Sequence, residues 1–219
     1  MNISAFAAVF KRFGTIALLH DLFISILSKL FFFRVLVIYL LNASTALAVI
    51  PEDVDIHLMS LAALLKFKDR EEYELPEQFL NEALKNGDQC FGAFINNELA
   101  GYAWYAMKES TSSRRLTTHF SPCYVYAYKN LTLAAYKGRG IQKWIKTFTF
   151  NFYKEMDKKG IIVAIESQNF SSRRSTAGTG AKIIGFWPYA LKNGRYFGFG
   201  TSGCKRIGYG LESAERKDI

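Results

Sequence analysis

Apolar residues recur at spacings of three and four along the first thirty positions of the chain. This spacing is typical of amphipathic helices, so we expect one or two of them over residues 3–30. A helix that spans a membrane needs about twenty mostly uncharged apolar residues. No window here supplies them, because Lys11, Arg12 and Asp21 interrupt the pattern. The run 33–41 is almost entirely apolar and predicts a buried strand.

The middle of the chain combines helical and strand-like patterns. Residues 52–86 have helical periodicity, which predicts one helix around 59–65 and another around 79–84. Two apolar runs on either side of Asn96-Asn97 predict a β-hairpin. The polar stretch 108–121 is rich in Ser and Thr, and we expect it to be a loop lying over a site.

The most strand-like run of the chain is 123–133. Strict alternation along a strand places one set of its side chains on one face, namely Tyr124, Tyr126, Tyr128, Asn130 and Thr132. The opposite face then receives Val125, Ala127, Leu131 and Leu133. A long helix over 141–158 and a short buried strand over 161–165 are expected to follow.

The last third of the chain predicts a helix over 171–179 and a hairpin around Asn193-Gly194, which is a strong type I′ turn signal. Helices and strands thus follow one another without an internal repeat. This order predicts a mixed α/β domain whose central strand, glycine-containing loop and helix form the ligand site.

Composition limits the class of protein. The chain has 219 residues, of which 50% are hydrophobic and 16% aromatic, and this composition is incompatible with disorder. The three cysteines form no CxxC pair, so we expect neither a disulfide framework nor a zinc site. All three are expected to be small buried residues in a protein of the reducing cytosol.

The formal net charge is +9, which is compatible with nucleic acid, an anionic membrane, an acidic carrier protein or a polyanionic cofactor. The basic residues occur in short groups, and Lys137 with Arg139 and Lys143 with Lys146 flank a glycine pair. This clustering favours a local phosphate site over a nucleic-acid surface.

The glycine pair lies in the segment 136–142, between the predicted strand and helix. Backbone N–H groups at the start of a helix have no partner within the helix and carry the positive end of its dipole. Gly138 and Gly140 permit a sharp turn and a close approach of phosphate. The segment matches neither the P-loop nor the GxGxxG pattern. Taken alone, it therefore indicates a plain turn as much as a phosphate-binding loop.

The run Thr132-Leu-Ala-Ala-Tyr-Lys-Gly-Arg-Gly-Ile-Gln142 resembles the acetyl-CoA signature of the GCN5-related N-acetyltransferase (GNAT) superfamily. The spacing from Asn169 to Gly180 and the upstream hairpin with Gly101 also match the family pattern. The resemblance covers roughly 33–201. It implies a mixed, mostly antiparallel central sheet flanked by helices, to which this chain adds an N-terminal amphipathic segment.

The resemblance also implies a site for acetyl-CoA or another acyl-CoA, which would serve as the acyl donor. The backbone of the loop would bind the pyrophosphate, and it comprises Lys137, Gly138, Arg139, Gly140, Ile141 and Gln142. The strand residues Leu131, Thr132 and Leu133 would pair with the pantetheine arm. Asn169 and Ser172 would contact that arm. Gln142 replaces the usual Gly or Ala, so its side chain must point away from the phosphates.

Catalysis departs from the family pattern. Many members have a Tyr seven residues after the Asn, as the general acid, whereas this chain has Thr176, whose hydroxyl is far less acidic. Glu166 is the candidate base for the attacking amine, and Tyr128 is a candidate for proton transfer or for lining the acceptor cavity. A salt-bridged surface carboxylate and a packed sheet tyrosine are the alternatives. His57 and His119 have no matching partners, and no metal site is expected.

We therefore expect an N-acyltransferase that acts on an amine by direct attack. Two alternatives stay open: a long-chain enzyme that uses acyl-CoA or acyl carrier protein, and an inactive CoA-binding protein of the same fold. A nucleic-acid-binding function is less favoured than either alternative. The expected division is a helical extension over 1–32, an acyltransferase-like domain over 33–210 and a polar tail over 211–219. The expected location is cytoplasmic, with membrane association through the N-terminal helix as an option; a signal peptide ending at 46–48 is a weaker one.

Overall fold

The structure is a computed structural model that describes residues 3–30, 32–42, 48–68, 70–111, 116–192 and 195–213. The expected turn residues Asn193 and Gly194 lie outside the described residues, as do Ala46 and Leu47. The helices are α1 (Ile3–Leu30), α2 (Leu61–Leu65), η1 (Glu71–Tyr73), α3 (Glu77–Lys85), η2 (Ala134–Tyr136), α4 (Ile141–Glu155), α5 (Phe170–Ala177) and α6 (Ser202–Arg206). The strands are β1 (Phe32–Leu41), β2 (Val54–Leu58), β3 (Gln89–Ile95), β4 (Glu98–Ala106), β5 (Ser110–Thr111), β6 (Leu116–His119), β7 (Tyr124–Thr132), β8 (Gly160–Glu166), β9 (Lys182–Lys192), β10 (Arg195–Gly198) and β11 (Gly210–Ser213).

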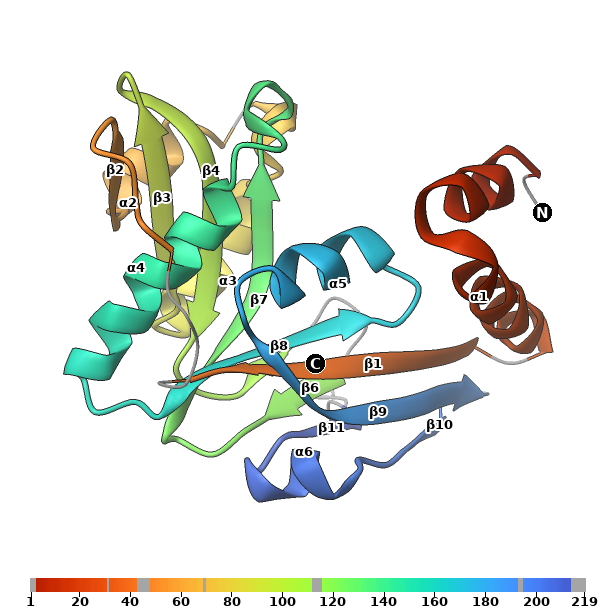
Figure 1. Ribbon diagram of the computed structural model, residues 1–219. Coiled ribbons are helices and arrows are strands. Elements are labelled where there is room, and N and C mark those ends of the chain that lie inside the picture. The colour runs from red at the N-terminus through yellow and green to blue at the C-terminus, as the bar shows by residue number, and fades with distance from the viewer. Residues whose placement is uncertain are drawn as a thin grey trace.

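An eight-stranded sheet in the order β10-β9-β1-β8-β7-β4-β3-β2 forms the centre of the molecule (Figure 1). Its neighbouring strands are antiparallel except for β7 and β8, which are parallel. A parallel connection needs a crossover, and α4 provides it. The fold prediction of a mixed, mostly antiparallel sheet flanked by helices is confirmed.

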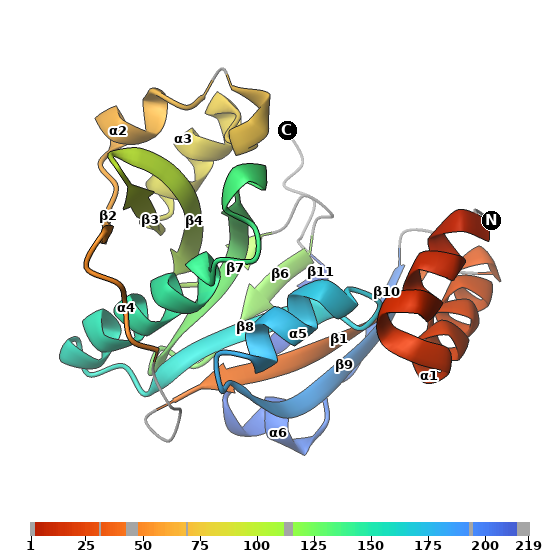
Figure 2. The ribbon, with the colours of Figure 1, turned by 45° about the horizontal axis from the view of Figure 1, so that its top comes forward.

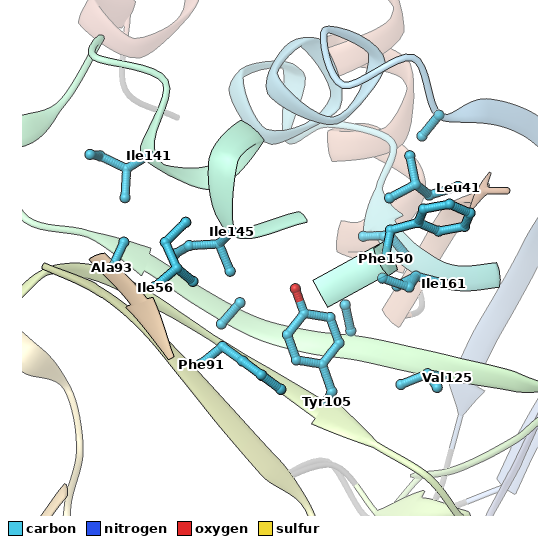
Figure 3. Packing of buried hydrophobic residues seen from close by; sticks show 14 of the residues in the cluster. Leu41, Ile56, Phe91, Ala93, Tyr105, Val125, Ile141, Ile145, Phe150 and Ile161 are labelled. Carbon is cyan, nitrogen blue, oxygen red and sulfur yellow. The ribbon is translucent and has the colours of Figure 1, made fainter. Parts of the chain in front are cut away.

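Helix α4 covers one face of the sheet and completes the main core (Figure 3). Its inward stripe includes Ile141, Ile145 and Phe150, which pack against buried side chains of β3, β4, β7 and β8. Polar contacts also lie inside this core; in one of them the Thr149 hydroxyl donates to the Tyr105 hydroxyl over 2.9 Å. Burial of this apolar stripe fixes α4, and therefore the loop that precedes it, against the sheet.

The opposite face of the sheet is covered by two separate groups of elements. Helices α2 and α3 pack over β3 and β4 around the fully buried Trp104 and Tyr102. A second, three-stranded sheet in the order β11-β6-β5 and helix α6 pack on this face against β1, β8 and β9. Helix α5 lies on the same side as α4, over β8 and β1 (Figure 2).

Helix α1 packs against the end of α5 at the edge of the molecule (Figures 1 and 2). The Phe13 and Phe170 rings lie 5.3 Å apart, and Gln168 donates to the Asp21 carboxylate. A kink at Gly14, where φ is 84°, divides α1 in two, as expected for one or two helices. Its outer face exposes Phe10, Ile16, Leu19, Phe23 and Ile26. None of the helices in the described ranges is both long and apolar enough to cross a membrane.

Three strands in two parts of the chain were not predicted. Residues 54–58 form β2. The sequence Val-Asp-Ile-His-Leu does alternate apolar and polar positions with the period of a strand, but this signal was not used. The expected loop over 108–121 is wrong in part, because Ser110–Thr111 and Leu116–His119 pair as β5 and β6. These strands lie on the face of the large sheet opposite α4 and α5.

Two smaller expectations also change. Cys90 and Cys204 are buried as expected, whereas Cys123 is only half-buried. The first residues of the expected tail, 211–213, belong to β11, where Leu211 packs against Tyr189. Residues 214–219 lie outside the described part of the chain. The domain boundaries after residues 32 and 210 stay predictions.

Candidate functional site

A cleft lies where the two parallel strands of the sheet separate. β7 and β8 pair only between Tyr124–Ala127 and 160–163. Beyond these residues β7 pairs with β4 alone, and β8 pairs with β1 alone. A cavity of about 350 Å³ occupies the gap, between α4 and α5. Its lining includes Tyr128, Asn130, Gln142, Lys146, Glu166, Asn169, Ser172 and Thr176.

A β-bulge at Tyr128 marks the point at which β7 leaves β8. Trp104 pairs with Lys129 and Tyr105 pairs with Ala127, so Tyr128 has no residue opposite it on β4. An extra residue reverses the alternation of the side chains that follow it. The expected arrangement of faces is therefore wrong beyond Ala127. Leu131 and Leu133 pack with Trp104 on the α3 side, whereas Val125 and Ala127 pack beneath α4.

The bulge also determines which backbone groups face the cleft. The Leu131 carbonyl oxygen lies against Gly101 of β4 and the Leu133 N–H donates to the Ala100 carbonyl of β4, so both residues direct their backbone groups toward β4. In a strand, neighbouring residues direct these groups to opposite sides. Asn130 and Thr132 therefore present their N–H and C=O groups at the cleft edge of β7.

The glycine loop lies at the start of α4, as predicted. Gly138 and Gly140 have φ of 84° and 93°, values that L-residues rarely adopt, and Gly140 is the N-cap. Within the described residues the N–H groups of Gly138, Gly140, Ile141 and Gln142 have no hydrogen-bond acceptor. Residues 137–140 are exposed. The loop therefore presents several free N–H donors to solvent at the positive end of a helix dipole.

The Gln142 side chain points back into the sheet, away from the loop. Its Nε2 donates to the carbonyls of Leu131 (2.8 Å) and Tyr102 (3.1 Å). It thereby ties α4 to β4 and β7 and leaves the loop backbone uncovered. A long side chain at this position is compatible with an anion at the loop for that reason.

Asn169 and Ser172 are brought together at the start of α5, on the wall of the cleft opposite β7. The Asn169 Oδ1 accepts the Ser172 N–H over 3.1 Å, which is the geometry of a helix N-cap. The capping bond occupies the Asn169 carbonyl oxygen, so the amide Nδ2 is the group left to contact a ligand.

Glu166 lines the cleft at the end of β8, and its carboxylate lies 3.6 Å from Arg34 Nε. Arg34, near the start of β1, donates from Nη1 to Ser28 Oγ of α1 over 2.7 Å. Glu166 therefore has features of both hypotheses, because it lines the cleft, as a candidate base would, and also forms a salt bridge. Its side chain is about one-third exposed, which leaves it accessible to a bound molecule or water.

Tyr128 donates its hydroxyl to Asp88 Oδ2 over 2.9 Å. Burial and the neighbouring Asp88 raise the pKa of the Tyr128 phenol, so it is protonated at neutral pH. Burial also raises the pKa of Asp88 to about 6, against the effect of the hydrogen bond from Tyr128. Asp88 is only 6% exposed, and no pattern in the sequence indicates that it lies beside Tyr128.

Lys146 is the second residue whose role the sequence analysis missed. We grouped it with the charges around the phosphate loop, but its side chain is 3% exposed and lines the cleft. Its Nζ donates to Thr176 Oγ1 over 2.9 Å. Burial lowers the pKa of the Lys146 ammonium to about 8. The available signal was its position beside Ile145 and one turn after Gln142, on the inward stripe of α4.

Comparisons with known proteins identify the fold. No family model and no curated protein matches the sequence. An acetyltransferase of the GNAT family from Colwellia psychrerythraea matches with a TM-score of 0.51 and 18% identity over 78% of this chain and 57% of that one. A GNAT-family structure from Novosphingobium aromaticivorans matches with a TM-score of 0.52 and 13% identity over 72% and 63%. The match thus spans less than two thirds of either relative. The chain has the GNAT fold, and the resemblance is confirmed at that level.

Proposed function

We propose that this chain is an N-acyltransferase that transfers an acetyl or other acyl group from a CoA thioester directly to an amine. The observation that supports this most is the cleft between β7 and β8, which lies beside an exposed glycine loop at the start of α4. The two features together fit a ligand with an anionic head and a long arm. The GNAT fold supports acyl transfer as the reaction class.

In this proposal the loop 137–142 binds the CoA pyrophosphate. Its free N–H groups supply donors, and the α4 dipole favours negative charge at that end. Lys137 and Arg139 are exposed and add two positive charges at the same place. The side chain of Gln142 is turned into the sheet and leaves room for the phosphates.

The pantetheine arm would enter the cleft and take the place of the missing strand between β7 and β8. Of the expected residues 131–133, Thr132 supplies backbone groups on the cleft side, and Asn130 adds a second set. Leu131 and Leu133 contribute by packing β7 against the α3 side. Asn169 and Ser172 would contact the arm from α5.

Attack on the thioester requires a neutral amine, which must lose a proton as the amide forms. Glu166 is the candidate base, directly or through water, because it lines the cleft and Arg34 holds its carboxylate in place. Tyr128 lies at the bulge, and we assign it to the wall around the reacting carbonyl. Its hydroxyl is engaged by Asp88, which fixes the orientation of the ring.

Ligand binding tests the proposal before any acceptor is known. Acetyl-CoA at about 100 times its Kd should stabilise the chain by about 2.7 kcal/mol, a rise of several degrees in Tm for a domain of this size. The matched control is NAD⁺, which has a pyrophosphate and adenine but no thiol arm. Equal shifts with both ligands, or none with acetyl-CoA, would contradict a CoA site.

Transfer is then measured as release of CoA thiol in the presence of a panel of amines. Acyl-amine product accompanied by an equal amount of thiol is the expected result. Binding of acetyl-CoA without transfer to any amine would favour the inactive CoA-binding alternative, which the replacement of the usual Tyr by Thr176 keeps open.

One observation favours the long-chain alternative. The outer face of α1 exposes large apolar side chains, including Ile16 at 86%, and α1 is packed on α5, which forms one wall of the cleft. A long acyl chain, or the membrane or acyl carrier protein that delivers it, would contact such a face. Comparison of kcat/KM for acetyl-CoA, palmitoyl-CoA and acyl carrier protein donors separates the two enzymes. A preference for acetyl-CoA would eliminate the long-chain form.

A further inference from the structure

The floor of the cleft contains a buried lysine. Lys146 projects from α4 and is 3% exposed, although lysine is among the residues least often buried. Within the described residues no carboxylate lies within ion-pair distance of its ammonium. Its one hydrogen-bond partner there is a neutral hydroxyl, that of Thr176, at 2.9 Å.

A buried ammonium with a neutral partner destabilises the fold, because an unpaired charge loses its hydration. Met or Leu would fit the same inward stripe of α4 without this penalty. A destabilising group in a cleft is typical of residues that serve binding or chemistry. An ammonium has three donors, and Thr176 accepts one of them. The other two are available to a molecule in the cleft.

We propose that Lys146 donates the proton that the CoA sulfur takes up as it leaves, and that Thr176 positions the Lys146 ammonium. This inference rests on the proposed acyltransferase function and extends it to the step in which Thr176 replaces the tyrosine that many members of the family use as general acid. Lys146 would be a catalytic residue, and Thr176 a positioning residue.

The neutral amine of the acceptor attacks the thioester carbonyl, the C–N bond forms and the C–S bond breaks. The sulfur takes the departing electron pair and a proton from Lys146 Nζ, which gives the CoA thiol. The new amide nitrogen releases its extra proton through the base to solvent, and Lys146 regains one from solvent. The net change is amine plus thioester to amide plus thiol.

The acidity of Lys146 is suited to this role. Proton donors are most effective when their pKa is close to that of the group they serve and to the working pH. Burial lowers the pKa of Lys146 to about 8, and an ordinary thiol has a pKa of about 8.5. The other ionisable groups that line the cleft are Tyr128 and Lys129 on β7 and Glu166 on β8. Thr176 could not donate this proton itself, because its hydroxyl is too weak an acid.

The first test needs no acceptor. CoA with its free thiol is bound to the chain, and the ultraviolet absorbance of the thiolate is followed as a function of pH. A cation within contact distance should raise the thiolate fraction at pH 7 by about tenfold or more over free CoA. Lys146→Met should abolish this increase, whereas Lys146→Arg should retain it. Lys154→Met is the matched control, since Lys154 is an exposed lysine on the same helix, and it should behave as wild type.

The second test separates proton donation from charge alone. Lys146→Met and Lys146→Arg should both lower kcat by about 100-fold or more with CoA affinity within about twofold of wild type, because arginine keeps the charge but does not release its proton. The kcat of wild type should fall above pH 8 as Lys146 loses its proton, and both variants should lose this fall. Thr176→Val should lower kcat less, and Thr176→Tyr should restore much of the activity of Lys146→Met.

The outcomes distinguish this inference from the proposed function. Bound CoA with the same thiolate fraction in wild type and Lys146→Met would overturn the inference alone, as would an unchanged kcat and pH profile. Acetylation of Lys146 itself, detected by mass spectrometry after incubation with acetyl-CoA, would also overturn it, since an amide cannot donate this proton. Failure of wild type to bind CoA would overturn both.

Discussion

The Lys146 ammonium donates a 2.9 Å hydrogen bond to the Thr176 hydroxyl, and this bond joins α4 to α5 beneath the cleft. Both side chains are buried, with exposures of 3% and 2%. The two helices that bound the cleft are therefore connected by a polar contact whose donor changes charge near neutral pH. This contact has a consequence for stability as well as for the proposed chemistry.

Stability should depend on pH through Lys146. Its pKa is lowered on folding to about 8 from 10.5, so above pH 8 the unfolded chain binds more protons and the free energy of unfolding rises with pH. We expect wild type to gain about 2 kcal/mol relative to Lys146→Met between pH 7 and pH 9.5. Urea unfolding of both proteins at the two pH values measures this difference, and a constant difference would contradict it. The comparison cancels the titration of groups that the two proteins share.

The glycine loop provides a matched pair of substitutions. Gly138 and Gly87 both have positive φ, at 84° and 78°, and a Cβ at either would meet nothing within 4 Å. Glutamate at either site should therefore cost similar stability, about 1 kcal/mol. Only Gly138→Glu places a carboxylate at the proposed pyrophosphate site. It should weaken acetyl-CoA binding by at least about 100-fold in calorimetry, whereas Gly87→Glu should bind as wild type does. Equal affinities would remove the loop from the site.

Asp88 should reduce stability at neutral pH. Its pKa is raised on folding from 3.8 to about 6 by burial, so the folded state holds the proton more tightly and stability falls as pH rises through 6. Asp88→Asn keeps an acceptor for the Tyr128 hydroxyl and removes the charge. We expect the variant to be more stable than wild type by about 1–3 kcal/mol at pH 7 and of similar stability at pH 4. Thermal unfolding at both pH values provides the measurement, and a less stable variant at pH 7 would refute the assignment.

The stability of the protein should be reduced more by a charge at position 142 than by loss of the amide group there. Its Nε2 faces the carbonyls of Tyr102 and Leu131, and Gln142→Glu would place a carboxylate against two acceptors. That variant should lose at least about 2 kcal/mol at pH 7. Gln142→Met removes the donor but adds no charge, so it should lose less. Denaturant unfolding gives the order of the two variants, and the reverse order would show that the side chain does not occupy the sheet.

The sequence predicted most elements of the fold because their patterns are local. The apolar run of β1, the hairpin of β3 and β4 and the inward stripe of α4 all follow from periodicity within one element. β2 has the same kind of signal in Val54 to Leu58, but the charged stretch around it has helical periodicity, and we assigned the whole stretch to helices. β6 pairs on one side with β5 and on the other with β11 from the far end of the chain, and no local pattern indicates such a distant partner.

The site shows where local patterns fail. Alternation along 123–133 gave the correct faces only as far as Ala127, because a bulge is determined by pairing with β4 and not by the strand itself. The charge of Lys146 predicts an exposed side chain like that of Lys143, whereas its position on the helix predicts a buried one like that of Ile145. Position determined its burial, because the packing of α4 on the sheet outweighs the desolvation of one ammonium. The Asp88–Tyr128 pair connects residues 40 apart, and the sequence offers no signal for it.

The position of β1 has a consequence for biosynthesis. This strand ends at Leu41, yet in the sheet it lies between β8 and β9, which come more than a hundred residues later (Figure 1). A ribosome adding about 5–20 residues per second needs roughly 6 to 30 seconds to reach them. During that interval one of the most apolar segments of the nascent chain has neither neighbour. We expect it to be a principal binding site for chaperones on the ribosome, and an aggregation-prone segment when the chain is refolded at high concentration.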